Sequence, residues 1–325
     1  MTNNIFREKS FLLYKKHETI PFDEFVKQVP SNYEGLIFKT IDRDAIGRSA
    51  GNPRWGRVFE YKDGEISQDC KIAIYKEADF DEPDGPYAEQ MWSTFAKYMI
   101  PECKIPEIDI VEDKGFLGYP GVISYSIVDK DKEEMSDIRT VLRFNGVAES
   151  DMVKNDDRIY IEDLLKYVKE FIGNEENYKE VEAQIVKTIL LDCITNTFDR
   201  HPDNWALVCD MESGKYTLGL YDNTISFINM LNSRPGVVDR ENWGRVFITV
   251  KNKSNRLTDM ANEVIEYIYD KYPQYFKQFF ETLDNNLDKF YEEIGQDKYK
   301  NIVNGLNKKK SYMKKVMNKD REYDY

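Results

Sequence analysis

Short apolar runs, separated by a Gly-rich segment and a polar turn, mark the chain from about residue 33 to residue 80. The runs GLIFKTI, RVFEY and CKIAIYK are typical of strands, and the turn KDGE separates the last two. Short strands interrupted by Gly and Pro are also indicated in KIPEIDIVEDKGFLGYPGVISYSIV, at residues 104–128. The first part of the chain is therefore predicted to form a sheet that contains a hairpin.

Helical spacing begins directly after the loop DEPDGP. In YAEQMWSTFAKYM, apolar residues recur with the period of a helix at Met91, Phe95, and Tyr98 or Met99. Glu89 falls in the first turn of this predicted helix. One helix is thus expected to follow the sheet.

From about residue 130 onward the period is mainly helical. The segment EVEAQIVKTILLDCITNT carries a wide apolar stripe, as a helix buried in an α-rich lobe requires. The stripe consists of Val181, Ile185, Val186, Ile189, Leu190, Cys193 and Ile194. A β interlude is predicted at 205–222, and residues 257–325 are again helical, with an aromatic-rich part that suits core packing.

The order of these elements predicts an α+β fold with two lobes around a cleft. A sheet and one helix come first, a connector follows near residues 124–132, and a helical lobe with one hairpin completes the chain. A length of 325 residues is sufficient for such an arrangement. We place the N-lobe at residues 1–127 and the C-lobe at residues 128–325.

Composition narrows the class of partner. The formal net charge of −13 argues against a nucleic-acid binder, which usually presents a basic face. The four cysteines have no CxxC spacing and lie in or beside apolar runs, which favours reduced thiols and a cytoplasmic location. No secretory signal and no run of roughly 20 apolar residues is present, so no membrane span is expected, although a signal-less export route stays open.

The segment NTFDRHPDNW carries the densest group of chemically active residues. Asp199 and Asn204 are five positions apart, which is the Asp-to-Asn step of the protein-kinase catalytic loop. Phosphoryl transfer needs a carboxylate that orients the attacking hydroxyl and an amide oxygen that holds magnesium. The alternative is that both residues are turn formers between a helix and a strand.

A predicted hairpin follows this segment. The apolar runs NWALVCD and KYTLGLYD flank MESG, and a turn centred on Ser213 would place Asn204 directly opposite Asp222. The amide and the carboxylate could then share a metal ion. A register error of one residue would turn one of the two side chains to the other face.

Residues suited to bind nucleotide phosphates occur earlier in the chain. Lys76 ends the strand IAIYK, and Glu89 opens the next helix. Protein kinases pair a strand Lys with a Glu of the following helix to position phosphates. Alternatively, Lys76 is a solvated strand end that Lys71 would replace in another register, and Glu89 only favours the helix dipole.

The segment IGRSAGNPRWG precedes that strand. Gly47, Gly51 and Gly56 would allow backbone N–H groups to approach anionic oxygens. The segment is not a Walker A sequence, and its glycine spacing is not that of G-x-G-x-x-G. On its own it is a weak indication of a phosphate-binding loop.

Taken in order, these motifs resemble the HipA-like kinases, in which an N-x-x-D-x-H-x-x-N loop precedes a metal-binding Asp. NTFDRHPDNW and LGLYDN carry this loop, GRSAGNPRWGRVFEYKDGE is similar to the nucleotide loop, and IAIYK and AEQMWSTFAKYM are similar to the lysine strand and the acidic helix. The resemblance spans about residues 45–230. The DRHxxN step is shared with phosphoinositide kinases, and the segment after Asp222 contains no DFG triplet.

The resemblance implies a bilobal protein-kinase-like fold, with a small mainly β N-lobe, a larger α-rich C-lobe and ATP in the cleft. It implies an ATP- and Mg²⁺-dependent kinase that phosphorylates Ser or Thr of an unidentified protein, and of itself in some cases. The implied site comprises a catalytic base, Asp199; metal ligands, Asn204 and Asp222; a phosphate contact, Lys76, paired with Glu89; a turn-organising residue, His201; and a nucleotide loop with Gly47, Ser49, Gly51 and Asn52.

Two other functions stay open at this point. The shared DRHxxN step also suits a lipid or small-molecule kinase. A nucleotide-binding pseudokinase that acts as an interaction module would need neither the base nor both metal ligands. The acceptor and the oligomeric state have no local signature in the sequence.

Overall fold

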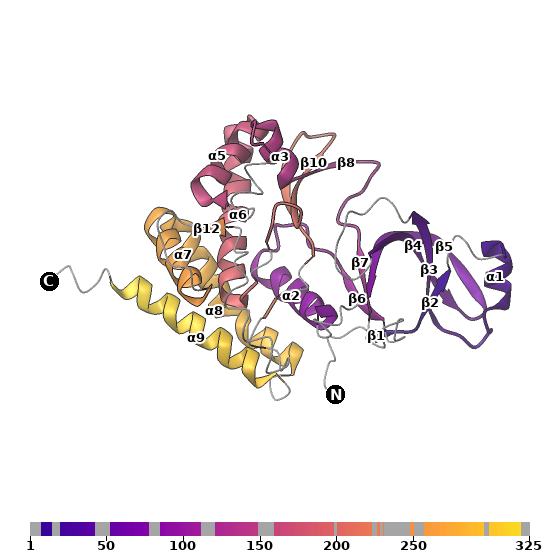
Figure 1. Cartoon of the computed structure of the whole chain (residues 1–325). Coiled ribbons are helices and arrows are strands. Elements are labelled where there is room, and N and C mark those ends of the chain that lie inside the picture. The colour runs from indigo at the N-terminus through magenta and orange to yellow at the C-terminus, as the bar shows by residue number, and fades with distance from the viewer. Residues whose placement is uncertain are drawn as a thin grey trace. The chain divides into compact units, whose positions relative to one another are not determined.

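The computed structural model describes residues 8–14, 20–42, 53–77, 85–111, 121–148, 159–197, 200–222, 226–227, 230, 248–249, 257–295 and 299–319. These residues divide into two compact units. The β unit comprises the described parts of Ile5–Met91 and Pro106–Ile127, and the helical unit comprises those of Trp92–Ile105 and Val128–Tyr325. The predicted α+β class is confirmed, because one unit is mainly strand and the other mainly helix (Figure 1).

The β unit contains a seven-stranded sheet with the order β1-β6-β7-β5-β4-β3-β2. The strands are β1 (Glu8–Lys9), β2 (Phe11–Tyr14), β3 (Gly35–Asp42), β4 (Arg54–Lys62), β5 (Glu65–Glu77), β6 (Ile108–Val111) and β7 (Gly121–Tyr125), and the short helix α1 (Phe22–Gln28) lies between β2 and β3 in the sequence. All strands predicted in this region are present. The hairpin turn KDGE is confirmed by the positive φ angles of Asp63 (55°) and Gly64 (82°), which two-residue hairpin turns favour.

The first two strands connect both edges of this sheet. β1 pairs in parallel with β6 at one edge, and β2 pairs in parallel with β3 at the other. A single residue, Ser10, separates β1 from β2, and its carbonyl oxygen accepts a hydrogen bond of 2.9 Å from the Leu36 N–H. The sheet is therefore curled, and its concave side encloses a core that includes Phe11, Phe38, Tyr75 and Ile123.

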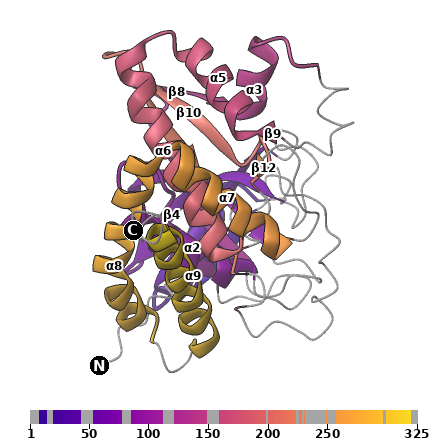
Figure 2. The ribbon, with the colours of Figure 1, turned by 90° about the vertical axis from the view of Figure 1, so that its left-hand side faces the viewer.

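The helical unit is built around α6 (Glu175–Thr195), which packs against α5 (Ile161–Ile172), α7 (Leu257–Lys271), α8 (Pro273–Ile294) and α9 (Lys300–Lys319). The last three helices also pack against one another beside α6 (Figures 1 and 2). All seven residues of the predicted apolar stripe of α6 are buried. None of the described helices combines the length and the apolar composition that crossing a bilayer requires.

Helix α2 (Gly85–Met99) belongs to both units, because its residues from Trp92 onward group with the helical unit. The Phe95 ring stacks on Phe290 of α8 at a centroid distance of 4.4 Å, and the Tyr98 hydroxyl donates a hydrogen bond of 2.6 Å to Glu293. Trp92–Ile105 groups with the helical unit, and the lobe boundary at residue 127 stays a prediction.

A three-stranded antiparallel sheet, in the order β11-β10-β8, completes the part of the helical unit that carries the predicted hairpin. β10 (Trp205–Asp210) and β11 (Tyr216–Leu220) are the expected strands, whereas β8 (Glu133–Asp137) lies where the sequence predicted helix. The helix prediction was wrong here because EEMSD has no apolar alternation and is held by pairing with β10, as in Met135↔Val208. Helix α3 (Ile138–Phe144) follows β8 directly, and β9 (Ile159–Tyr160) pairs with β12 (Ile248–Thr249).

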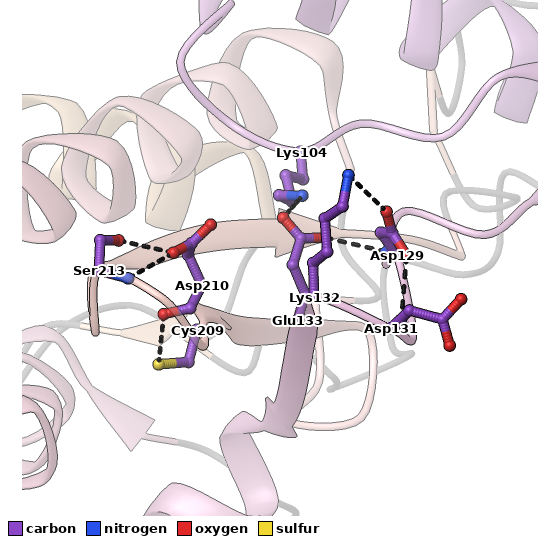
Figure 3. Close-up of polar contacts among 8 residues, drawn as sticks. All are labelled: Lys104, Asp129, Asp131, Lys132, Glu133, Cys209, Asp210 and Ser213. Atoms are coloured by element: carbon purple, nitrogen blue, oxygen red, sulfur yellow. Dashed lines mark hydrogen bonds and ion pairs between the residues drawn. The ribbon is translucent and has the colours of Figure 1, made fainter.

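Lys104 ties this small sheet to the segment after α2 (Figure 3). Its backbone donates to the carbonyl of Leu218 at 2.8 Å and accepts from the N–H of Leu220 at 3.0 Å, and its ammonium pairs with Glu133 of β8. At the turn of the hairpin, the Asp210 carboxylate accepts hydrogen bonds from the backbone N–H and the hydroxyl of Ser213. Strand β11 is therefore fixed by Lys104, and the turn of the hairpin is fixed by Asp210.

Candidate functional site

The loop that follows α6 starts from a well-defined helix end. Asn196 has a φ of 51° and its N–H bonds to the Asp192 carbonyl, which ends the helix. Beyond it, the Thr197 hydroxyl bonds to the hydroxyls of Thr195 at 2.8 Å and of Ser226 at 3.0 Å. The loop is thus fastened both to the helix before it and to the chain after the hairpin.

Several predicted site residues lie outside the described residues. They are the predicted base Asp199 and the nucleotide-loop residues Gly47, Ser49, Gly51 and Asn52. Their roles stay predictions. The description of the loop accordingly resumes at Arg200.

Arg200 anchors the loop to the helix before it. Its side chain is 3% exposed and forms a bidentate ion pair with Asp192 of α6, with Nε–Oδ2 at 2.9 Å and Nη2–Oδ1 at 3.0 Å. Burial raises the pKa of the Asp192 carboxyl, and the adjacent guanidinium opposes that rise. The face of the Trp92 indole lies 4.9 Å from the Arg200 Cζ atom, a cation–π distance.

The remaining nitrogen of Arg200 reaches the start and the end of the hairpin. Nη1 donates a hydrogen bond of 3.2 Å to the carbonyl of Asn204 and a long one of 3.5 Å to the carbonyl of Tyr221. The Tyr221 N–H in turn donates to the Asn204 carbonyl at 3.1 Å. One guanidinium therefore bonds to backbone groups at or next to both predicted metal ligands, Asn204 and Asp222.

The register of the hairpin differs by one residue from the predicted one. Trp205 pairs with Leu220 and Ala206 with Gly219, so that Asn204 lies beside Tyr221 and not directly opposite Asp222. The predicted centre at Ser213 was wrong because the loop MESG has four residues, and its midpoint lies between two of them.

Asp222 still lies at the same end of the hairpin as Asn204. It follows Tyr221 and has a φ of 55°, which turns the chain out of the strand direction. Asn204 is 2% exposed, whereas Asp222 is partly exposed. Aspartate tolerates a positive φ better than most residues other than glycine.

The Tyr221 hydroxyl senses the charge of several carboxylates at this end of the hairpin. Burial, followed by the charges of Asp137, Asp203 and Asp222, raises the pKa of the Tyr221 hydroxyl. The donor set at this end, an amide oxygen and carboxylates, is the one that Mg²⁺ prefers. Within the described part of the chain, no group of three or more His, Cys, Asp or Glu side chains is arranged to hold a metal ion. A magnesium ion held by Asn204 and Asp222 would depend on phosphate oxygens for further ligands, as Mg²⁺ commonly does.

The next part of the loop contacts α3 through Pro202 and Asp203. The Arg139 guanidinium forms a bidentate pair with Asp203, with bonds of 2.6 and 2.7 Å. The Asp203 N–H donates to Nδ1 of His201 at 3.3 Å, and the Arg139 N–H donates to the Pro202 carbonyl. His201 thus accepts a hydrogen bond within the turn, and its role as the organiser of the turn stays a prediction. Although burial works in the opposite direction, hydrogen bonds with His201 and Arg139 hold the pKa of Asp203 well below its usual range.

In the β unit, the predicted phosphate-binding residues are buried. Lys76 on β5 is 8% exposed and Glu89 on α2 is fully buried, so neither is a solvated surface charge. Lys71, the alternative to Lys76, is 66% exposed and pairs with Glu107. Because α2 begins at Gly85, Glu89 lies beyond its first turn, where the helix dipole has little effect. Buried charges need compensating partners, which supports a specific role for both residues, while their mutual pairing stays a prediction.

Gly56 has a packing role that the sequence did not reveal. A Cβ atom at this position would lie 2.3 Å from Cζ and 2.4 Å from Cε1 of the buried Phe38 ring. Gly56 is therefore required by the core of the β unit, independently of any role near phosphates.

Sequence reasoning also missed Asp192, Arg200, Asp203 and Arg139 as parts of the site. One signal was available, because Asp192 is a charged residue within an otherwise apolar helix stripe. The pairing of Arg139 with Asp203 joins positions 64 residues apart and has no local signature.

No protein-family model matches the chain, and neither does any curated protein sequence. Solved structures do match its fold. The Helicobacter pylori proinflammatory kinase CtkA matches with a TM-score of 0.50 and 12% identity, covering 89% of this chain and 98% of that chain. A chain from the complex of HipA, HipB and operator DNA of the Shewanella oneidensis MR-1 toxin–antitoxin system matches with a TM-score of 0.50 and 9% identity, covering 85% of this chain and 66% of that one. The fold is therefore similar to that of HipA-like kinases, as the motifs implied.

Proposed function

We propose that the protein is an ATP- and Mg²⁺-dependent kinase that transfers the γ-phosphoryl group to Ser or Thr of a protein. The observation that carries this proposal is the end of the β10–β11 hairpin. There the buried Asn204 and the partly exposed Asp222 lie at one end of the hairpin, beside a loop with kinase-like spacing, on a chain with a kinase-like fold. A simple turn would account for the positive φ of Asp222, but it would not require the Asn204 side chain to be buried.

The proposed roles follow from the chemistry of the side chains. Mg²⁺ held by Asn204 and Asp222 would neutralise charge on the phosphates. Asp199 would orient the acceptor hydroxyl, whose oxygen attacks the γ-phosphorus while the bond to the β–γ bridging oxygen breaks. The hydroxyl proton passes to the Asp199 carboxylate, and ADP leaves. Lys76 would bind phosphate oxygens, with Glu89 fixing the position of its ammonium.

Transfer from γ-labelled ATP tests this proposal. Purified protein is incubated with labelled ATP and Mg²⁺, alone and with a generic basic protein, a phosphoinositide or a small alcohol as acceptor. The Asp199→Asn and Asp222→Asn variants are run beside Asp210→Asn. Asp210 is a matched control because it lies at the turn end of the same hairpin, where it bonds Ser213.

We expect labelled protein with the parent and with Asp210→Asn, and roughly 10²- to 10⁴-fold less with Asp199→Asn if this residue is the base. Near-normal transfer by Asp199→Asn would contradict its assignment. Label on the lipid or the alcohol alone would replace the protein acceptor by another class. Binding of ATP without transfer to any acceptor would indicate a pseudokinase.

A further inference from the structure

The Asp192–Arg200 ion pair is a costly feature for a helical core. Both side chains are more than nine-tenths buried, and removing two charges from water costs free energy that their attraction does not always recover. Apolar residues of similar volume would fill the same space without that cost. A buried pair at this position therefore calls for an explanation beyond packing.

We infer that Arg200, held by Asp192, is a positioning residue for the metal ligands Asn204 and Asp222. This inference rests on the proposed function, because it concerns the magnesium site of the same reaction. Arg200 itself touches neither metal nor substrate in this assignment. It acts on the backbone carbonyls of Asn204 and Tyr221, and through them on the two ligands.

The shape of the guanidinium makes Arg200 suitable for this task. Nε and Nη2 are committed to the two oxygens of Asp192, so the plane of the group is fixed relative to α6. Nη1 then points at the hairpin in a direction set by that plane. Lysine has one ammonium on a flexible stem and could satisfy the charge of Asp192, but it could not hold three groups in one rigid arrangement.

The Trp92 ring restrains the same group from its face. Trp92 is fully buried, and its ring lies 4.9 Å from the Arg200 Cζ atom. Trp92 follows Glu89 by three positions in α2. The helix that carries the predicted partner of Lys76 therefore also carries the aromatic ring that packs on Arg200.

The conformation of Asp222 shows why such a restraint would matter. Its φ of 55° is one of several conformations that an aspartate can adopt, so its neighbours decide which one is kept. The bond from Nη1 to the Tyr221 carbonyl acts on the peptide group that leads directly into Asp222. Without this bond, Asp222 would be free to relax to a commoner conformation and withdraw its carboxylate from the site.

Metal binding distinguishes a positioning role from a merely structural one. The affinity of the protein for Mn²⁺ in the presence of a non-hydrolysable ATP analogue is measured by electron paramagnetic resonance. The variants are Arg200→Lys, Asp192→Asn and the double apolar replacement Asp192→Leu with Arg200→Met. Leu283→Ala serves as a control that destabilises the core, because Leu283 is a fully buried residue of α8 outside the site.

For Arg200→Lys we expect the Mn²⁺ dissociation constant to rise by roughly 10- to 100-fold, the usual effect of losing an outer-shell partner. The double apolar variant should regain thermal stability over Asp192→Asn yet keep the weakened Mn²⁺ affinity. Leu283→Ala should lose stability with its Mn²⁺ affinity unchanged. The KM for ATP should change less than the metal affinity in each site variant.

The same titration separates failure of this inference from failure of the proposed function. Asn204→Ala and Asp222→Ala are measured alongside. If these two variants abolish Mn²⁺ binding while Arg200→Lys remains within about twofold of the parent, the positioning role alone is overturned. If neither ligand variant affects Mn²⁺ binding, or the parent does not bind the ion, the magnesium site and this inference are overturned together.

Discussion

Replacing Gly56 by alanine tests whether this residue is needed for packing or for access to phosphates. Gly56 lies on β4 between Thr40 of β3 and Ala73 of β5. The added Cβ would lie 2.3 and 2.4 Å from two carbons of the Phe38 ring and 2.7 Å from the Lys39 carbonyl oxygen. Favourable carbon contacts are about 3.5–4.0 Å, so the ring would have to move by more than about 1 Å.

The Phe38 ring has little room for such a movement. It is fully buried, and its centroid lies 6.0 Å from that of Phe11 and 5.9 Å from that of Tyr75. Overpacking of a core typically costs about 1–3 kcal/mol. With two ring atoms and one backbone atom obstructed, we expect Gly56→Ala to lower the free energy of unfolding by about 3 kcal/mol.

A double-mutant cycle with Phe38→Leu provides the control. Leucine lacks both obstructing ring carbons, so Gly56→Ala should cost only about 1 kcal/mol in that background, where the Lys39 carbonyl still interferes. Urea unfolding gives the free energies, and hydrogen exchange of the β3–β5 amides shows whether the loss arises in the β unit. An alanine variant within about 0.5 kcal/mol of the parent, or an equal cost in both backgrounds, would refute the packing argument. Weaker ATP binding at full stability would instead support the phosphate role.

Two further predictions concern the loop and the sheet closure. Because the folded pKa of Asp203 is depressed, its pairing stabilises the protein above the ordinary carboxyl pKa of about 3.9 and is lost as pH falls through and below that value. Asp203→Asn should therefore be less stable than the parent near neutral pH, by no more than about 1 kcal/mol because the Asp203 side chain is 43% exposed. In urea unfolding, this difference in stability should shrink below about pH 4. A difference that stays constant with pH would contradict the prediction. Deletion of Glu8–Tyr14 exposes the edges of β3 and β6. It should cause aggregation, detected by light scattering, and faster amide exchange in both strands. A monomeric variant with unchanged exchange would argue against closure of the sheet by β1 and β2.

Much of the fold could be predicted because its signals are local. The apolar runs of β3 and β5 and the apolar stripe of α6 are each patterns within a single segment, which one sequence displays directly. The turn at Asp63 and Gly64 is equally local, since both residue types adopt positive φ readily. β8 escaped prediction because its residues are polar and its strand conformation depends on pairing with β10.

The roles of Asn204 and Asp222 stay predictions, but their relative placement can be compared with the sequence. Centring the turn on Ser213 misplaced the register by one residue, because a four-residue loop has its midpoint between two residues. The support for the loop was missed because Arg200 and Arg139 bond to groups on other elements. Side-chain pairing between distant segments is set by tertiary packing, and one sequence contains no pattern that records it.

The closure of the β unit by its first strands has a consequence for synthesis. β2 can pair with β3 as soon as about 40 residues have been made, but Glu8 pairs with Ile110, roughly a hundred residues later. At translation speeds of about 5–20 residues per second, β1 is synthesised several seconds before its partner β6. The segment Trp92–Ile105, which groups with the helical unit, is also synthesised before β6. For that interval the backbone N–H and C=O groups that later join β1 to β6 have no partner strand. A ribosome-associated chaperone could bind the nascent chain there.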